Sequence, residues 1–223
     1  FNPATKLGNY SSLTSCTGCQ QSAVSKEKLL DFIRGDTSNE DNGTGTNTDL
    51  FRQRISVLGD IVNGQPAYVR NSPFSYNDTG YADFKKCTDG TGTDCPAAQF
   101  PSPTIRRKPT VYVGANDGML HAFEVDVNNS PYYQTAGIST DVTTDDTFST
   151  GNNTGNGVER WAYIPAMLLP NLAQLADTNY QHRYYVDGSP QIGDICTSTP
   201  CAGLNDWRTI LVGGFNSGGK GFY

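Results

Sequence analysis

The sequence predicts an all-β chain built from a repeated four-stranded antiparallel unit. The first observation is the stretch 111–124, VYVGANDGMLHAFE, where two runs rich in apolar residues flank Asn116-Asp117-Gly118. Asn, Asp and Gly tolerate positive φ at little cost, so this stretch is a predicted β-hairpin. The second observation is a partial echo at 210–223, ILVGGFNSGGKGFY. Strand, Gly-rich turn and strand therefore occur twice, as expected of a repeated sheet unit.

The chain begins with a lead-in segment, residues 1–50, that carries one short helix. Ser25 is a typical N-cap, and apolar residues recur at helical spacing after it. The predicted helix covers 25–34 and ends at Gly35, which can adopt the left-handed conformation. An acidic, polar loop is expected over 36–49.

Four strands in a row predict one complete unit at the start of residues 51–223. Polar insertions rich in turn formers separate the first strand from the second and the third from the fourth. A four-stranded antiparallel unit is the composition of a β-propeller blade. The strands are expected near 66–70, 110–115, 119–125 and 159–165.

A second short helix is expected over 167–177, where Pro170 is tolerated only in the first turn. A second unit then begins, with strands expected at 184–186, 190–195, 209–215 and 221–223. A propeller needs about four to eight blades to close. Residues 51–223 are therefore interpreted as the first blade and part of the second blade of a truncated β-propeller.

The cysteines predict local disulfides. All six fall in close pairs, and two of the pairs enclose short loops rich in turn formers. Such disulfides indicate an oxidising compartment, although six cysteines allow fifteen pairings. For Cys16-Thr17-Gly18-Cys19 the alternatives are half a zinc site or a redox pair, but both histidines lie in predicted blade segments and no βαβ setting is present. The expected pairs are Cys16–Cys19, Cys87–Cys95 and Cys196–Cys201.

Composition argues against two classes of partner. The formal net charge is −6, whereas nucleic-acid binding needs a basic surface. No apolar run is long enough for a transmembrane segment. The chain starts at Phe1 without a visible signal peptide, and a processed or excised chain would look the same.

Arg34-Gly35-Asp36 is an integrin-type tripeptide at the end of the first predicted helix. In a functional role Asp36 would bind the metal ion of an integrin and Arg34 would enter an acidic pocket. The alternative is local: Arg34 ends the helix, Gly35 caps it and Asp36 starts the loop. Changing Asp36 to Glu and measuring cell adhesion separates the two.

The acidic loop that follows offers Glu40 and Asp49 as weak calcium candidates. With Gly43 at the sixth position of an EF-hand-like loop, Glu40 takes the third and Asp49 the twelfth. The first position is Ser38, which lacks a carboxylate, so a solvated loop is the preferred interpretation.

No catalytic residues are predicted. Asp117 and Asp187 lie in turns, where Asp is common for conformational reasons. His121 and His182 are the only histidines, and His121 is interpreted as a strand residue. No Ser-His-Asp or Cys-His arrangement follows from the spacing.

The predicted blade resembles those of quinoprotein-type propellers, in which a Trp such as Trp161 packs between neighbouring sheets. A narrower likeness covers about 28–223: the chain is similar to the C-terminal propeller domain of the PilY/PilC family, large exported proteins of bacterial type IV pili. The segments that carry it, in the family's order, are RISVLGDIVNGQPAYV (54–69), KPTVYVGANDGMLHAF (108–123), ERWAYIPAMLLPNLAQLAD (159–177), HRYYVDGSPQIGDI (182–195) and WRTILVGGFNSGGKGFY (207–223).

The resemblance implies a non-enzymatic role in pilus biogenesis and in adhesion to host-cell or abiotic surfaces. It implies export, location at the cell surface, pilus tip or outer membrane, and minor pilins as partners. It also implies a longer parent protein, which has calcium in later blades; no cofactor is expected in this fragment. Two alternatives remain open: a quinone (PQQ)-dependent dehydrogenase, for which the adjacent-cysteine pair is missing here, and a generic periplasmic scaffold propeller.

Overall fold

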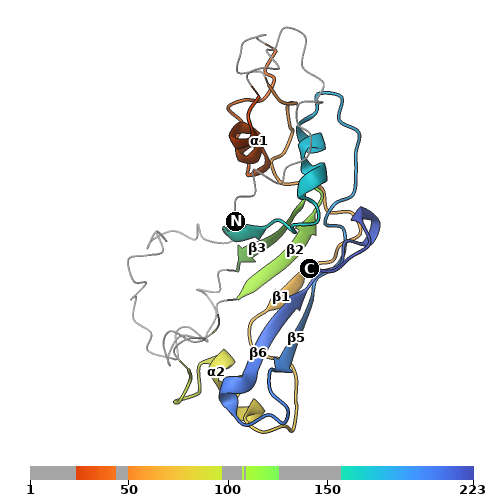
Figure 1. Cartoon of the computed structure of the whole chain (residues 1–223). Helices are drawn as coiled ribbons and strands as arrows, with labels where there is room; N and C mark the ends of the chain where they lie inside the picture. The colour runs from red at the N-terminus through yellow and green to blue at the C-terminus, as the bar shows by residue number, and fades with distance from the viewer. Residues whose placement is uncertain (1–23, 44–49, 97–106, 108, 126–156) are drawn as a thin grey trace, which may run out of the picture.

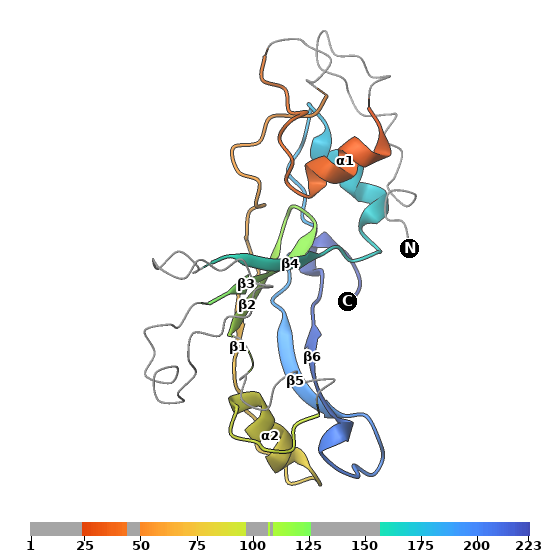
Figure 2. The same ribbon diagram turned by 90° about the vertical axis from the view of Figure 1, so that its left-hand side faces the viewer.

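The computed structural model describes residues 24–43, 50–96, 107, 109–125 and 157–223. These residues form an elongated molecule with a helical cap at one end, two antiparallel sheets in the middle and a small lobe around helix α2 at the other end (Figure 1). The view turned by 90° shows that the sheets do not close on themselves (Figure 2).

The first sheet confirms the predicted four-stranded unit. Its strand order is β1-β2-β3-β4, and every neighbouring pair is antiparallel. The central hairpin turns at Gly118, which has a φ of +93°. Asp117 stabilises this turn because its Oδ1 accepts a hydrogen bond from the backbone N–H of Met119 at 3.0 Å. The strands are β1 (Ala67–Val69), β2 (Thr110–Ala115), β3 (Met119–Glu124) and β4 (Glu159–Tyr163).

The second sheet pairs β5 (Gln191–Cys196) with β6 (Trp207–Val212). The chain then turns through the 3₁₀ helix η6 (Asn216–Gly218), and Gly213 and Tyr223 exchange backbone hydrogen bonds of 3.0 and 2.9 Å. The predicted last strand, 221–223, is thus present only as an isolated antiparallel bridge between Gly214 and Phe222.

The strand expected at 184–186 is wrong. The backbone there bonds to turns instead of to a neighbouring strand. Tyr185 donates its N–H to the side-chain oxygen of Asn116 at 3.0 Å. Asp187 donates its own to the carbonyl of Phe215 at 3.4 Å. Sequence pattern alone cannot distinguish a short apolar run that pairs with turns from one that pairs with a strand.

Two helical segments form the cap. The first prediction is confirmed: α1 (Lys26–Ile33) begins at Ser25, whose hydroxyl accepts from the N–H of Lys28 at 3.2 Å, and Gly35 follows it with a φ of +111°. The second is the 3₁₀ helix η4 (Leu169–Ala176), shorter than the predicted 167–177 and with Pro170 in its first turn. The cap contains the main hydrophobic core, formed mainly by Leu29, Phe32, Ile33, Phe51, Leu169, Leu172, Leu175, Val186 and Phe215.

The distal lobe contains a helix that the sequence analysis missed. Helix α2 (Tyr81–Asp89) lies inside the first polar insertion and packs near the short 3₁₀ helix η5 (Leu204–Asp206). Its apolar residues recur at helical spacing, but Gly80 precedes it and no side chain caps it. Its buried face forms a second hydrophobic cluster of Tyr81, Phe84, Cys87 and Trp207.

Within the described residues, Trp161 does not lie between two sheets, and its predicted packing between blades stays a prediction. Trp161 is 43% exposed and packs on Tyr112 of the adjoining strands at 5.6 Å between ring centroids. Strand β4 is exposed along its whole length, so no neighbouring sheet within the described residues encloses the ring. Trp207 is instead the buried indole, and its Nε1 donates to the carbonyl of Thr79 at 2.9 Å.

Candidate functional site

A group of charged side chains surrounds His121 on β3. Its Nδ1 lies 2.6 Å from Glu159 Oε1 on β4, and its Nε2 lies 3.0 Å from Asp117 Oδ2 in the hairpin turn. The histidine side chain is 5% exposed and Asp117 is 10% exposed, while Glu159 is 44% exposed. One buried imidazole on β3 therefore joins the hairpin turn to the outer strand β4.

The two carboxylates favour the charged imidazolium. Burial alone lowers the pKa of His121, but hydrogen bonding and charge attraction from Asp117, followed by Glu159, outweigh burial and raise that pKa above its ordinary value of 6.5. Both ring nitrogens then act as donors in charge-assisted hydrogen bonds. Because neither nitrogen is left to accept a proton, the arrangement suits a structural link rather than a general base.

A cavity of about 730 Å³ lies beside this histidine. Its walls come from three places: the end of α1, the segment at Val57, and strands β3 and β4. The lining is mostly apolar, with Arg34 and the His121 cluster supplying the polar groups. Across the described part of the chain, no group of three or more His, Cys, Asp or Glu is arranged to hold a metal ion.

The Arg34-Gly35-Asp36 tripeptide lies at the end of α1, as the local alternative expects. Gly35 donates its N–H to the carbonyl of Phe32 at 3.0 Å, and Asp36 Oδ1 accepts from the N–H of Ser38 at 2.6 Å. Hydrogen bonds from Ser38 lower the pKa of Asp36. Arg34 and Asp36 are both exposed. The integrin-type role remains a prediction.

Glu40 does not fit a calcium role in this structure. Its Oε1 lies 2.5 Å from Arg54 Nε, and its Oε2 accepts from the N–H of Arg54 at 3.1 Å. Both side chains are less than 10% exposed. A buried guanidinium already neutralises this carboxylate and engages both of its oxygens, which disfavours cation binding there. Asp49 lies outside the described residues.

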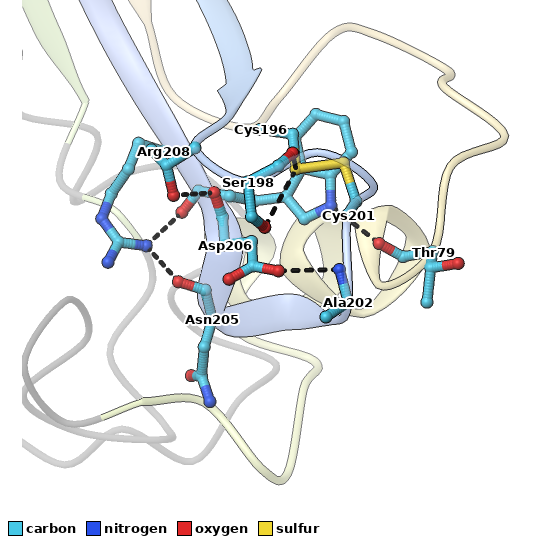
Figure 3. Close-up of a disulfide and its surroundings, with 10 residues drawn as sticks. Thr79, Cys196, Ser198, Cys201, Ala202, Asn205, Asp206 and Arg208 are labelled. Atoms are coloured by element: carbon cyan, nitrogen blue, oxygen red, sulfur yellow. Dashed lines mark hydrogen bonds between the residues drawn. A yellow bond between two sulfur atoms is a disulfide. The ribbon is translucent and has the colours of Figure 1, made fainter.

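The distal lobe contains two disulfides, Cys87–Cys95 and Cys196–Cys201, which are the neighbour pairings expected for these four cysteines. The pair Cys16–Cys19 lies outside the described residues. Figure 3 shows the loop closed by Cys196–Cys201, where Asp206 accepts from the N–H of Ala202 at 2.7 Å. Both bridges adjoin the cluster around Trp207, so they fasten the first insertion and the β5–β6 loop onto one core.

Sequence reasoning missed a buried polar network centred on Asp194 of β5. Its Oδ2 accepts hydrogen bonds from Ser72 and Tyr81, the latter at 2.9 Å, and its Oδ1 accepts from Thr209 at 2.6 Å. Arg107 donates to the same threonine hydroxyl at 2.7 Å. Burial first, and then Asp194, raises the pKa of Tyr81 to about 12. The only sequence signal was an Asp inside a predicted strand, where Asp is uncommon.

Asp187 has a similar role between the two sheets. It is 1% exposed and accepts from the backbone N–H and the side-chain amide of Asn63 at 3.2 and 2.8 Å. The side-chain amide of Asn216 is 3.3 Å away. Its interpretation as a turn residue was therefore incomplete, because it also fixes the first sheet to the second.

No helix within the described residues is long and apolar enough to span a membrane, and no solved structure gave a significant match. Two curated relatives are type IV pilus biogenesis factors. The PilY1 homolog of Xylella fastidiosa (strain Temecula1) is 34% identical over 202 residues, 90% of this chain and 13% of the relative. PilY1 of Pseudomonas aeruginosa (strain PAK) is 33% identical over 195 residues, 86% of this chain and 12% of the relative.

The chain thus spans roughly an eighth of the length of these relatives. The model of the PilY1 beta-propeller domain matches residues 58–223, which include both sheets, η4 and both described disulfides. The chain belongs to the PilY1 beta-propeller domain family.

Proposed function

We propose that this chain is part of an exported, non-enzymatic type IV pilus biogenesis factor. The observation that carries the proposal is the family match over 58–223, together with relatives that are named type IV pilus biogenesis factors. The parent protein acts at the pilus tip or outer membrane, contacts minor pilins, and contributes to adhesion to host cells or abiotic surfaces.

The disulfides support export. Local disulfides persist outside the cytosol, where glutathione and thioredoxin do not reduce them. Cys87–Cys95 and Cys196–Cys201 both fasten loops onto the core around Trp207. A surface protein that bears mechanical load benefits from loops that cannot unfold separately.

The geometry at His121 supports a scaffold rather than an enzyme. Its two nitrogens are both engaged by carboxylates, and Asp117 also receives the N–H groups of Gly59 and Met119. These groups hold chain segments together, which is a structural role.

The function is tested by deleting the gene of the parent protein and complementing it with the wild type or with Cys196→Ser/Cys201→Ser. Loss of surface pili, counted by electron microscopy of sheared fractions, is the expected result of deletion. Wild-type pilus number and wild-type attachment to epithelial cells and glass after deletion would contradict the proposal. Absorbance of a bound quinone in the purified parent protein would favour the dehydrogenase alternative.

A further inference from the structure

A short segment precedes the first strand of each sheet in nearly the same form. The two copies are Val62-Asn63-Gly64-Gln65-Pro66 before β1 and Val186-Asp187-Gly188-Ser189-Pro190 before β5. In each copy the glycine lies against the second strand of its own sheet or the residues that directly follow it. A Cβ at Gly64 would be 3.5 Å from the carbonyl of Gly188 and 3.7 Å from that of Gly114, and one at Gly188 would be 2.1 Å from that of Gly214. Ala67 pairs with Tyr112 and Gln191 pairs with Val212, so Gly114 and Gly214, each two residues further on, are equivalent positions.

The contact between the sheets uses the second copy of this segment. A Cβ at Gly114 would lie 2.6 Å from the carbonyl oxygen of Val186, so only glycine allows this approach. Asn63 donates twice to Asp187, and the N–H of Gln65 donates to Ser189 Oγ at 2.9 Å. Val186 is completely buried as a result.

The first copy has no such cover within the described residues. Val62, the equivalent of Val186, is 50% exposed. It ends an aliphatic strip of five exposed residues, of which Ile55 is fully exposed; the others are Val57, Leu58 and Ile61. Five exposed aliphatic side chains in eight residues are uncommon on the surface of a soluble domain and mark an interaction site.

The opposite end of the two-sheet unit has the complementary feature, an uncovered glycine. Gly214, the equivalent of Gly114, lines a cavity of about 650 Å³ together with Gly188 and Phe215. One end therefore presents a valine segment without a glycine partner, and the other presents a glycine without a valine partner, among the residues that the structure describes. Head-to-tail surfaces of this kind generate a ring when the rotation between units closes.

We propose that the aliphatic strip, Ile55–Val62, is the docking surface for the ring-closing blade of the same parent protein. That blade places a glycine of its second strand against the carbonyl of Val62, as Gly114 does against Val186. That blade also donates a hydrogen bond to the side-chain oxygen of Asn63. In this contact the Asn63 oxygen has the acceptor role that the Asp187 carboxylate has between the two described sheets. The occupant is intramolecular because the relatives have about eight times the length of this chain and a propeller closes only with further blades. The inference rests on the family and not on the proposed function.

The test introduces the photo-crosslinking amino acid benzoylphenylalanine at position 62 of the intact parent protein. After irradiation, mass spectrometry of tryptic peptides should identify a cross-link within one chain, next to a glycine in the second strand of a distant blade. The control position is Val158, which is similarly exposed at 44% but lies outside the strip; it should give no such product. A cross-link between two copies, a cross-link to another protein, or equal background yield at both positions would overturn the proposal.

A second measurement does not depend on cross-linking. Val62→Arg in the intact parent should increase the rate of limited proteolysis within residues 50–64 by about tenfold, because the charged side chain displaces the closing blade. Val158→Arg should leave that rate unchanged. Equal rates in the two variants would show that nothing covers Val62, and would overturn the proposal.

Discussion

At the scale of single residues, His121 makes stability depend on pH. Its pKa is higher in the folded protein than its ordinary value, so its contribution is fully present below pH 6.5 and is lost as pH rises through the raised folded value. We expect His121→Asn to reduce the free energy of unfolding most at pH 5.5 to 6.5, and progressively less at higher pH. Urea unfolding of both proteins across this range measures the difference. A constant difference at all pH values would contradict a charged His121.

Arg54 provides a second test at this scale. It binds Glu40, donates to the carbonyls of Phe32 and Asp36 at 2.8 and 3.0 Å, and lies over the Phe32 ring at 3.8 Å. Arg54→Ala leaves the Glu40 carboxylate buried without its charged partner, which costs about 3–5 kcal/mol of stability.

The matched control for Arg54→Ala is the double variant Arg54→Met/Glu40→Leu. It removes both charges together and leaves no unpaired buried charge, so it should be clearly more stable than Arg54→Ala in denaturant unfolding. Equal losses in the two variants would show that packing, and not the buried carboxylate, determines the effect.

At the scale of elements, the sequence predicted those elements whose conformation depends on short local patterns and not on distant parts of the chain. The turn at Gly118, the cap at Ser25 and the alternation of β2 and β3 are properties of short sequences, and these elements form as predicted. Helix α2 was missed because its stability comes from burial against Trp207, whose position no local pattern indicates. The His121 site was missed for the same reason: Glu159 reaches it across a strand pairing that joins residues 38 positions apart.

Two glycines provide a matched test of the contact between the sheets. Gly114→Ala places a Cβ against the buried carbonyl of Val186 and should cost about 1–3 kcal/mol through overpacking. Gly193→Ala in β5 meets nothing within 4 Å and should be neutral or slightly stabilising, because alanine restricts the unfolded chain. Thermal unfolding of the two variants measures the difference. A similar loss of stability in both would show that the contact between the sheets tolerates a methyl group.

At the scale of the whole molecule, the helical cap and the lobe around α2 lie at opposite ends of the sheets (Figures 1 and 2), and each contains one hydrophobic cluster. The cap is held by apolar packing between α1 and η4, whereas the distal lobe is held by aromatic rings, two disulfides and the Asp194 network. Elements that share few contacts can open independently with their own free energies. The two ends are therefore expected to behave as separate cooperative units.

Hydrogen exchange tests this independence with a reciprocal pair of variants. Leu172 is fully buried in the cap and Phe84 is 1% exposed in the lobe. Leu172→Ala should cost about 2–5 kcal/mol and Phe84→Ala about 3–5 kcal/mol, each through the cavity that it leaves. The first should accelerate amide exchange in α1 and η4 while α2 and β6 stay protected, and the second should do the opposite. If either variant accelerates exchange equally at both ends, the sheets transmit the loss and the molecule is a single cooperative unit.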